Sequence, residues 1–368
     1  MIKKSLLLIF ALLVLGFPNA VKAQVKWMNP IDSNEPYICG RAWNAEMGKS
    51  YNRLPERFKS TVTEKVWNNS LLTAGLKVRF ATTSSNIIVK YVCTSQNFGT
   101  LNLLGIVHSG VDLYGKTADG KSHWIANHMN WNHTGDTMTI SFPDLTLPKA
   151  RKAEYTLYLP NFNGVEWLAV GVDNNSDFKF LHQTKERPVV IYGTSIIHGA
   201  SPSRPGMSIT NILDRELFCP VINLGFSGSA YMEPAIFDML GEIDARLFVL
   251  DPVPNSVNLP VDEITNRAVA GVKKLRSLSK APILMSECHP IPDSIFRANV
   301  AERYRLANQA LHKAYKELKA AGIDNLHYMY SSEINMTEDA MIEGTHPNDI
   351  GCRAYAEAYK RKISQILH

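Results

Sequence analysis

The stretch VVIYGTSIIHG, residues 189–199, decides how the second half of the chain folds. Four apolar or aromatic residues run into Gly193, and Thr194 and Ser195 follow directly. A short apolar run that ends in glycine indicates a buried strand, and a Thr-Ser pair behind it favours the start of a helix. Taken alone, Ser195 is more often a helix cap than a nucleophile, so the rest of the chain must decide between these two roles.

Further apolar runs of the same kind follow along the chain. They are PVINLG (220–225), RLFVLD (246–251), PILMSE (282–287) and LHYMY (326–330). Amphipathic stretches, which predict helices, lie between or after them at residues 261–278, 295–322 and 353–367. Near-continuous apolar strands that alternate with long helices are typical of a parallel sheet covered on both faces.

The first half has a different pattern. LKVRFATT (76–83), TMTISF (137–142) and YTLYL (155–159) alternate apolar with polar residues, which indicates half-buried antiparallel strands in a β-sandwich. In the first of these strands, Leu76, Val78 and Phe80 share one face, while Lys77 and Arg79 lie on the other. The polar segment 175–188 ends in proline and marks the boundary. We predict a sandwich domain at 24–183 and an α/β domain at 184–368.

The chain opens with a leader. Lys3 and Lys4 precede an apolar run, and the small-residue pattern Val21-Lys22-Ala23 follows, as in a secretory signal peptide cleaved after Ala23. The run is too short to span a membrane comfortably. We therefore expect residues 1–23 to be removed and the mature chain to be periplasmic or secreted, without insertion into a membrane.

Charge and cysteine content exclude several classes of protein. The leader holds three lysines and no acid, so its removal lowers the formal net charge from +5 to +2, too little to favour a nucleic-acid partner. The five cysteines form no CxxC pair, so no zinc site is expected. A disulfide between Cys39 and Cys93 and buried free thiols both remain compatible with export. Nothing in the sequence determines the oligomeric state.

All six tryptophans fall in the first half of the chain. They are Trp27, Trp43, Trp67, Trp124, Trp131 and Trp167. Exposed tryptophans on a sandwich can stack on sugar rings, whereas buried ones fill its core. We predict that most of them belong to the sandwich core.

Reactive residues follow the strands of the second half. Ser195 follows the first strand, Gly228 the second and Asn255 the third, and Glu343 and His346 follow the last one. Ligands of an open parallel sheet bind beyond the carboxyl ends of its strands, so these residues are expected to meet there. A hydroxyl, an imidazole, a carboxylate and amide donors are what acyl transfer requires.

The chemistry assigns a role to each of these residues. A serine hydroxyl becomes a nucleophile when an imidazole accepts its proton, here Ser195 and His346, and Glu343 would hold the imidazole tautomer. The backbone N–H groups of Ser195 and Gly228 and the Asn255 amide would stabilise the oxyanion. Ile197 stands where the GxSxG elbow of α/β-hydrolases has its second glycine, so that class is excluded.

The motifs resemble the SGNH (GDSL-like) esterase and acylhydrolase superfamily. YGTSIIHG is similar to its first block in the form GxSIxxG, NLGFSG to the second, LDPVPN to the third and EGTHPND to the fifth. Residues 110–114, GVDLY, resemble the GxDLY motif of the N-terminal sandwich of one branch. Two positions depart from the pattern: Glu343 replaces the usual aspartate, and Val253 replaces a glycine.

The resemblance implies a flavodoxin-like three-layer α/β/α domain and ester hydrolysis without a metal or other cofactor. It also implies a small-molecule or oligosaccharide ester as substrate, and often deacetylation of glycans. The preferred hypothesis is an exported acetyl esterase. A lipase or phospholipase on the same fold and a degenerate carbohydrate-binding protein are the alternatives. Thr194 and Asp112 are candidate substrate contacts, although Asp112 is better explained as a structural residue of the sandwich.

Overall fold

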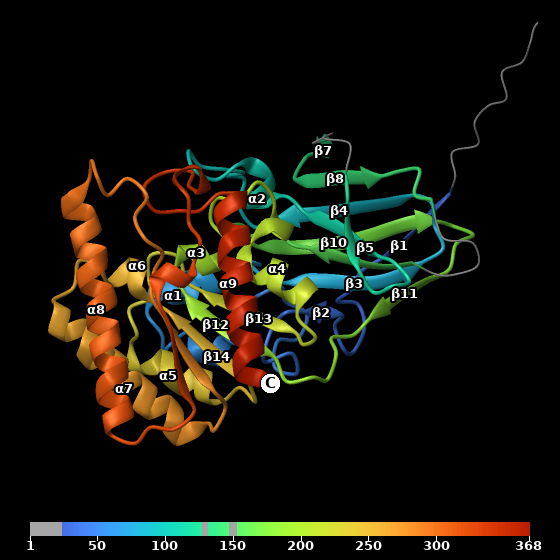
Figure 1. The fold of residues 1–368 in the computed structure, drawn as a ribbon. Helices are drawn as coiled ribbons and strands as arrows, with labels where there is room; N and C mark the ends of the chain where they lie inside the picture. Colours follow the sequence, from blue (N-terminus) through green and yellow to red (C-terminus); the bar gives the residue numbers. More distant parts are fainter. Residues whose placement is uncertain (1–23, 127–131, 147–152) are drawn as a thin grey trace, which may run out of the picture.

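The computed structural model describes residues 24–126, 132–146 and 153–368. Two antiparallel sheets are followed by one parallel sheet, as predicted (Figure 1). In Figure 1 the antiparallel sheets lie on the right, and the parallel sheet with its helices lies on the left. The leader predicted at 1–23 and Trp131 lie outside the described residues.

The antiparallel strands form two sheets. One has the order β1-β10-β4-β8-β7 and the other the order β11-β3-β9-β5-β6, with β2 paired to β3. Their bounds are β1 (Val25–Met28), β2 (Ile38–Cys39), β3 (Lys77–Thr82), β4 (Ile87–Cys93), β5 (Asp112–Lys116), β6 (Ser122–Ile125), β7 (Asn132–Thr134), β8 (Thr137–Phe142), β9 (Ala153–Tyr158), β10 (Val165–Asp173) and β11 (Phe178–Leu181). The strand β11 lies inside the polar segment 175–188 that marks the predicted boundary, and Phe178 of this strand packs on Phe80 of β3.

The sandwich core follows the alternating pattern. Val78 and Phe80 of β3 are fully buried with Val89 and Val170 from the opposite sheet. Lys77 points away from this core but is buried as well, because its ammonium pairs with Asp214 of the second half at 2.6 Å. At Lys77 the outer face of β3 is therefore an interface with the second half of the chain, whereas Arg79 on the same face is partly exposed.

The parallel sheet has the strand order β13-β12-β14-β15-β16. Its strands are β12 (Val189–Gly193), β13 (Val221–Gly225), β14 (Leu247–Asp251), β15 (Ile283–Ser286) and β16 (Leu326–Met329). The register places Gly193 level with Gly225 on one side and with Asp251 on the other. The residues that follow these three strands therefore emerge at one edge of the sheet.

Helices cover both faces of this sheet, as the apolar strands predicted. Val189 and Ile191 pack with α4 and α9, whereas Val190 and Tyr192 pack with α5, α7 and α8. The helices are α1 (Glu64–Ser70), α2 (Gly105–Ser109), α3 (Ser195–His198), α4 (Ile209–Glu216), α5 (Pro234–Gly241), α6 (Val253–Ser256), α7 (Val261–Leu278), α8 (Ala298–Ala320) and α9 (Asp349–Leu367), with short 3₁₀ turns at Glu56–Phe58, Pro205–Met207, Ser331–Glu333 and Glu338–Ala340. Within the described ranges, no helix has both the length and the apolar character needed to cross a membrane.

Part of the N-terminal half packs against the α/β half. Trp43 and Trp67 are buried in the same core as Tyr192, and the Trp43 indole N–H donates to Glu242 at 3.1 Å. The prediction that most tryptophans fill the sandwich core is wrong for the described ones, because none of them belongs to that core. The three others, Trp27, Trp124 and Trp167, are between 38 and 49 % exposed.

Arg53 is the central polar contact between the two halves. Its buried guanidinium donates to the carbonyl oxygens of Gly225 at 2.9 Å, Asn223 at 3.2 Å and Asn69 at 2.6 Å. Among the described residues it has no carboxylate partner within ion-pair distance, and desolvation lowers its pKa to about 9. Carbonyl oxygens must therefore satisfy this cation, which ties the segment before α1 to the end of β13.

All five cysteines are free and buried. The disulfide considered between Cys39 and Cys93 is not formed, and burial raises the pKa of the Cys39 thiol to about 11 and that of Cys93 to about 12. These thiols therefore remain protonated at neutral pH and behave as small apolar side chains.

Asp251 at the end of β14 makes stability depend on pH. Its carboxyl is buried and accepts from the Tyr359 hydroxyl at 2.7 Å, while Oδ1 has no hydrogen-bond partner among the described residues. Desolvation raises its pKa from 3.8 to about 7. The native state therefore binds more protons than the unfolded chain between these values, and the free energy of unfolding falls as pH rises, by up to ~1.4 kcal/mol per pH unit.

Asp251→Asn is expected to remove this contribution, because asparagine is neutral and still accepts from Tyr359. Urea unfolding of both proteins at pH 5, 6, 7 and 8 measures it. The stability of the variant relative to the wild type should increase from pH 5 to 7 and level off above. A difference that stays constant with pH would show that this carboxyl does not titrate there. Exposed Asp324→Asn is the control.

Candidate active site

Ser195 is the first residue of α3, directly behind β12. The Thr194 hydroxyl accepts from the Ile196 N–H at 3.4 Å and caps the helix, and Gly199 with φ +104° ends it. A side chain at Gly193 would collide with Ile197 and with the Asp251 carbonyl oxygen, so only glycine permits this tight turn. The turn presents the Ser195 hydroxyl at the carboxyl end of the sheet.

The structure brings the three predicted triad residues together. The Ser195 hydroxyl lies 2.8 Å from Nε2 of His346, and Nδ1 of the same ring contacts Oε1 of Glu343. Glu343 also accepts from the backbone N–H groups of Thr345 and His346, both at 3.0 Å. These bonds fix the carboxylate, so Nδ1 carries the proton and Nε2 faces the serine as a base.

The short loop that carries His346 is closed on itself. The Ile342 N–H donates to the His346 carbonyl at 2.9 Å, and the Asn348 N–H donates to Ala340 at 2.9 Å. Asn348 then caps α9 through its side chain. Glu343 is three residues from His346, and its side chain is longer than that of the usual aspartate. Both features are therefore compatible with contact at Nδ1 of His346.

The predicted oxyanion donors lie on two adjoining turns. Gly228 has φ +62°, a conformation that favours glycine, in the turn after β13. Asn255 lies in α6 after β14, and its Oδ1 accepts from the Ala230 N–H at 3.0 Å. This bond orients the amide and leaves the Nδ2 hydrogens without a protein acceptor among the described residues. Val253 is buried in the first turn of α6, and the valine does not prevent this contact.

His198 is a residue of this site that the sequence reasoning missed. Its Nδ1 accepts from the Ser227 N–H at 3.3 Å and its Nε2 donates to the Asn161 carbonyl at 2.9 Å, so the ring is neutral. Burial lowers its pKa well below the usual value. The ring orients the turn that carries Gly228. No sequence signal marks it, because its partners are 29 and 37 residues away.

Thr194 and Asp112 do not contact the substrate position. Thr194 is fully buried and its hydroxyl is used as a helix cap. Asp112 is also buried: it accepts from Trp124 at 2.7 Å and from the Gly206 N–H at 2.9 Å, and it forms an ion pair with Arg204 at 2.5 Å. The GxDLY aspartate therefore links the sandwich to the loop behind α3, which agrees with the structural role preferred from the sequence.

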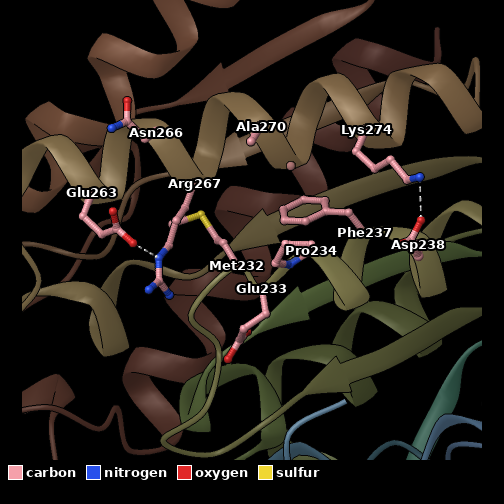
Figure 2. Close-up of a pocket in the computed structure, with 11 residues that line it drawn as sticks. Met232, Glu233, Pro234, Phe237, Asp238, Glu263, Asn266, Arg267, Ala270 and Lys274 are labelled. Atoms are coloured by element: carbon pink, nitrogen blue, oxygen red, sulfur yellow. Dashed lines mark hydrogen bonds and ion pairs between the residues drawn. The ribbon is translucent and has the colours of Figure 1, made fainter. Parts of the chain in front are cut away.

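A separate groove of about 630 Å³ runs between α5 and α7 (Figure 2). Phe237 lies in it, flanked by the ion pairs Glu263–Arg267 and Lys274–Asp238. None of the predicted site residues lines this groove, so it is not the reaction site. Across the described part of the chain, no group of three or more His, Cys, Asp or Glu residues is placed to hold a metal ion.

A hydrogen-bonded Ser-His-Glu array at the end of a parallel sheet is an arrangement that serine hydrolases use. Residues 186–364 match the GDSL-like Lipase/Acylhydrolase family, and residues 25–178 match the GxDLY family, described as the N-terminus of Esterase_SGNH_hydro-type. The chain belongs to the GDSL-like (SGNH) lipases and acylhydrolases and carries an N-terminal GxDLY domain. An ester hydrolase is the activity that this family implies.

Solved structures share this fold over nearly the whole chain. A protein described as a GDSL-like lipase from Bacteroides ovatus is 29% identical, with a TM-score of 0.84 over 94% of this chain and 98% of that one. The salicylyl-acyltransferase SsfX3 of a tetracycline biosynthetic pathway is 16% identical, with a TM-score of 0.69 over 93% and 97%. A family two carbohydrate esterase from Cellvibrio japonicus is 11% identical, with a TM-score of 0.54 over 94% and 98%. No curated protein sequence matches the chain.

Glu343→Gln is expected to lower kcat by several orders of magnitude, on the order of 10⁴, because an amide can present its NH₂ group to Nδ1 and stabilise the wrong tautomer. Steady-state hydrolysis of p-nitrophenyl acetate measures the loss. Glu338→Gln, at an exposed acid in the nearby 3₁₀ turn, is the matched control and should retain the wild-type rate. A loss of less than tenfold in Glu343→Gln would show that another group orients His346.

Proposed function

We propose that this chain is an exported serine esterase that removes short acyl groups, acetyl above all, from carbohydrate esters. The observation that carries the proposal is the 2.8 Å contact between the Ser195 hydroxyl and Nε2 of His346. This distance allows the proton to pass to the imidazole as the serine attacks.

The reaction proceeds through an acyl-enzyme. Ser195 Oγ attacks the ester carbonyl carbon while His346 accepts the serine proton, and Glu343 stabilises the imidazolium. The oxyanion is held by the N–H groups of Ser195 and Gly228 and by Asn255. His346 then gives its proton to the departing alcohol. Water, deprotonated by the same imidazole, attacks the acyl carbon and releases a carboxylic acid and free Ser195.

The substrate class rests on several independent features. The leader predicted at 1–23 favours a substrate outside the cytoplasm. Trp27, Trp124 and Trp167 are partly exposed on the N-terminal domain. Lys90 lies over the Trp27 ring and Arg204 over the Trp124 ring, so Trp167 is the described indole best suited to stack on a sugar ring. The fold is shared with family two carbohydrate esterases, among them one from Clostridium thermocellum in complex with cellohexaose, at a TM-score of 0.51.

Ser195→Ala is expected to abolish hydrolysis of p-nitrophenyl acetate without unfolding the protein, because the hydroxyl is the nucleophile and alanine fits the same turn. Wild-type protein should also be labelled at Ser195 by a fluorophosphonate, and the variant should not. Thermal unfolding of the variant provides the folding control. Unchanged turnover, or a wild-type chain that does not react with the label, would favour the alternative of a degenerate carbohydrate-binding protein.

A series of p-nitrophenyl esters from acetate to octanoate tests the acyl length. We expect kcat/KM to be highest for acetate and to fall with chain length, because a site for acetyl esters has no long apolar channel for the acyl group. A preference for octanoate over acetate would support the lipase alternative instead.

A further inference from the structure

A cation from the N-terminal half lies beside the turn after β13, which carries the proposed oxyanion donor Gly228. The Lys65 ammonium lies 2.7 Å from the position that a Cβ on Gly228 would occupy, so it fills the space of the missing side chain. Lys65 is exposed, and its ammonium has no hydrogen bond or ion pair among the residues that the structure describes. The ammonium can therefore pair with an anionic group of a bound ligand.

The helix that carries Lys65 is firmly fixed against this turn. Asn69, one turn further along α1, donates through its buried amide to the Ser227 carbonyl at 3.1 Å and to the Ser229 hydroxyl at 3.2 Å. The Arg53 guanidinium holds the Asn69 carbonyl at 2.6 Å. Trp67 of the same helix is buried in the α/β core. The backbone of Lys65 is therefore held beside this turn, and its exposed side chain reaches Gly228.

The position of the ammonium indicates whether Lys65 would bind the oxyanion or another part of the ester. The direction from Cα toward a Cβ diverges from the N–H of the same residue, so the Lys65 charge lies beside the oxyanion donor and not on its axis. The oxyanion already has three proposed donors, at Ser195, Gly228 and Asn255. A neighbouring part of the bound ester is thus the natural partner of the cation.

We propose that Lys65 selects esters whose alcohol part carries an anionic group, such as the carboxylate of an acidic sugar. This inference rests on the proposed function, because an acetyl group has no charge and the anion must then belong to the alcohol. A hydrogen bond between charged groups changes an equilibrium constant by about one to two powers of ten. Such an effect is large enough to determine substrate choice.

The test compares 4-acetoxybenzoate with neutral 4-acetoxybenzamide, which differ in charge and hardly in shape. We expect wild-type kcat/KM to favour the anionic ester by about tenfold to a hundredfold. The ratio should fall to about one in Lys65→Met, invert in Lys65→Glu and be retained in Lys65→Arg. Added salt should reduce the wild-type ratio. Lys273→Met, at an exposed lysine of α7, controls for net charge and should keep the wild-type ratio.

The outcomes separate this proposal from the proposed function. If the wild type hydrolyses both esters equally and Lys65→Met leaves the ratio unchanged, the esterase stands and the role of Lys65 is wrong. If Lys65→Met lowers kcat/KM of both esters by the same factor, Lys65 assists the oxyanion or the fold, and charge selection is overturned. If the wild type hydrolyses neither ester and fluorophosphonate does not label Ser195, the proposed function itself fails.

Discussion

The buried Arg53 guanidinium is the constraint on which the rest of the site depends. A cation without a carboxylate partner can remain in the interior only if carbonyl oxygens surround it, and these come from Asn69 of α1 and from Asn223 and Gly225 at the end of β13. The two halves of the chain therefore cannot separate without exposing the Arg53 guanidinium or depriving it of its hydrogen-bond acceptors. Because Gly225 immediately precedes the turn with Gly228, the same contact determines where the oxyanion donors lie.

Two further contacts across the domain interface also position segments of the site. His198 connects Asn161 of the first half to Ser227, and Asp112 of the GxDLY motif connects the sandwich to the loop behind α3. Both act on segments that adjoin the catalytic serine or its oxyanion turn. The N-terminal domain is thus a structural part of the candidate site, and the substrate selection proposed for Lys65 would use the same interface.

Much of the site could be predicted because it follows the strands in order. Ser195, Gly228 and Asn255 each lie just behind a buried strand. His346 follows the last strand after two 3₁₀ turns, and Glu343 is three residues from it. The residues that support them could not be predicted in the same way. Asn69 and Ser227 are 158 residues apart, and Arg53 and Gly225 are 172 apart, and no local pattern encodes such contacts. Trp43 and Trp67 were assigned to the wrong core for the same reason.

The sequence by itself determined the two fold classes, and it predicted the serine, histidine and glutamate that the structure brings into contact. Alternation and apolar runs dictate which face of a strand is buried, and parallel connection brings the carboxyl ends of the strands to one edge. Only the tertiary structure decided which N-terminal residues reach that edge. Docking of α1 onto the turn after β13 depends on the shape and polarity of two distant surfaces, and these exist only once both halves have folded.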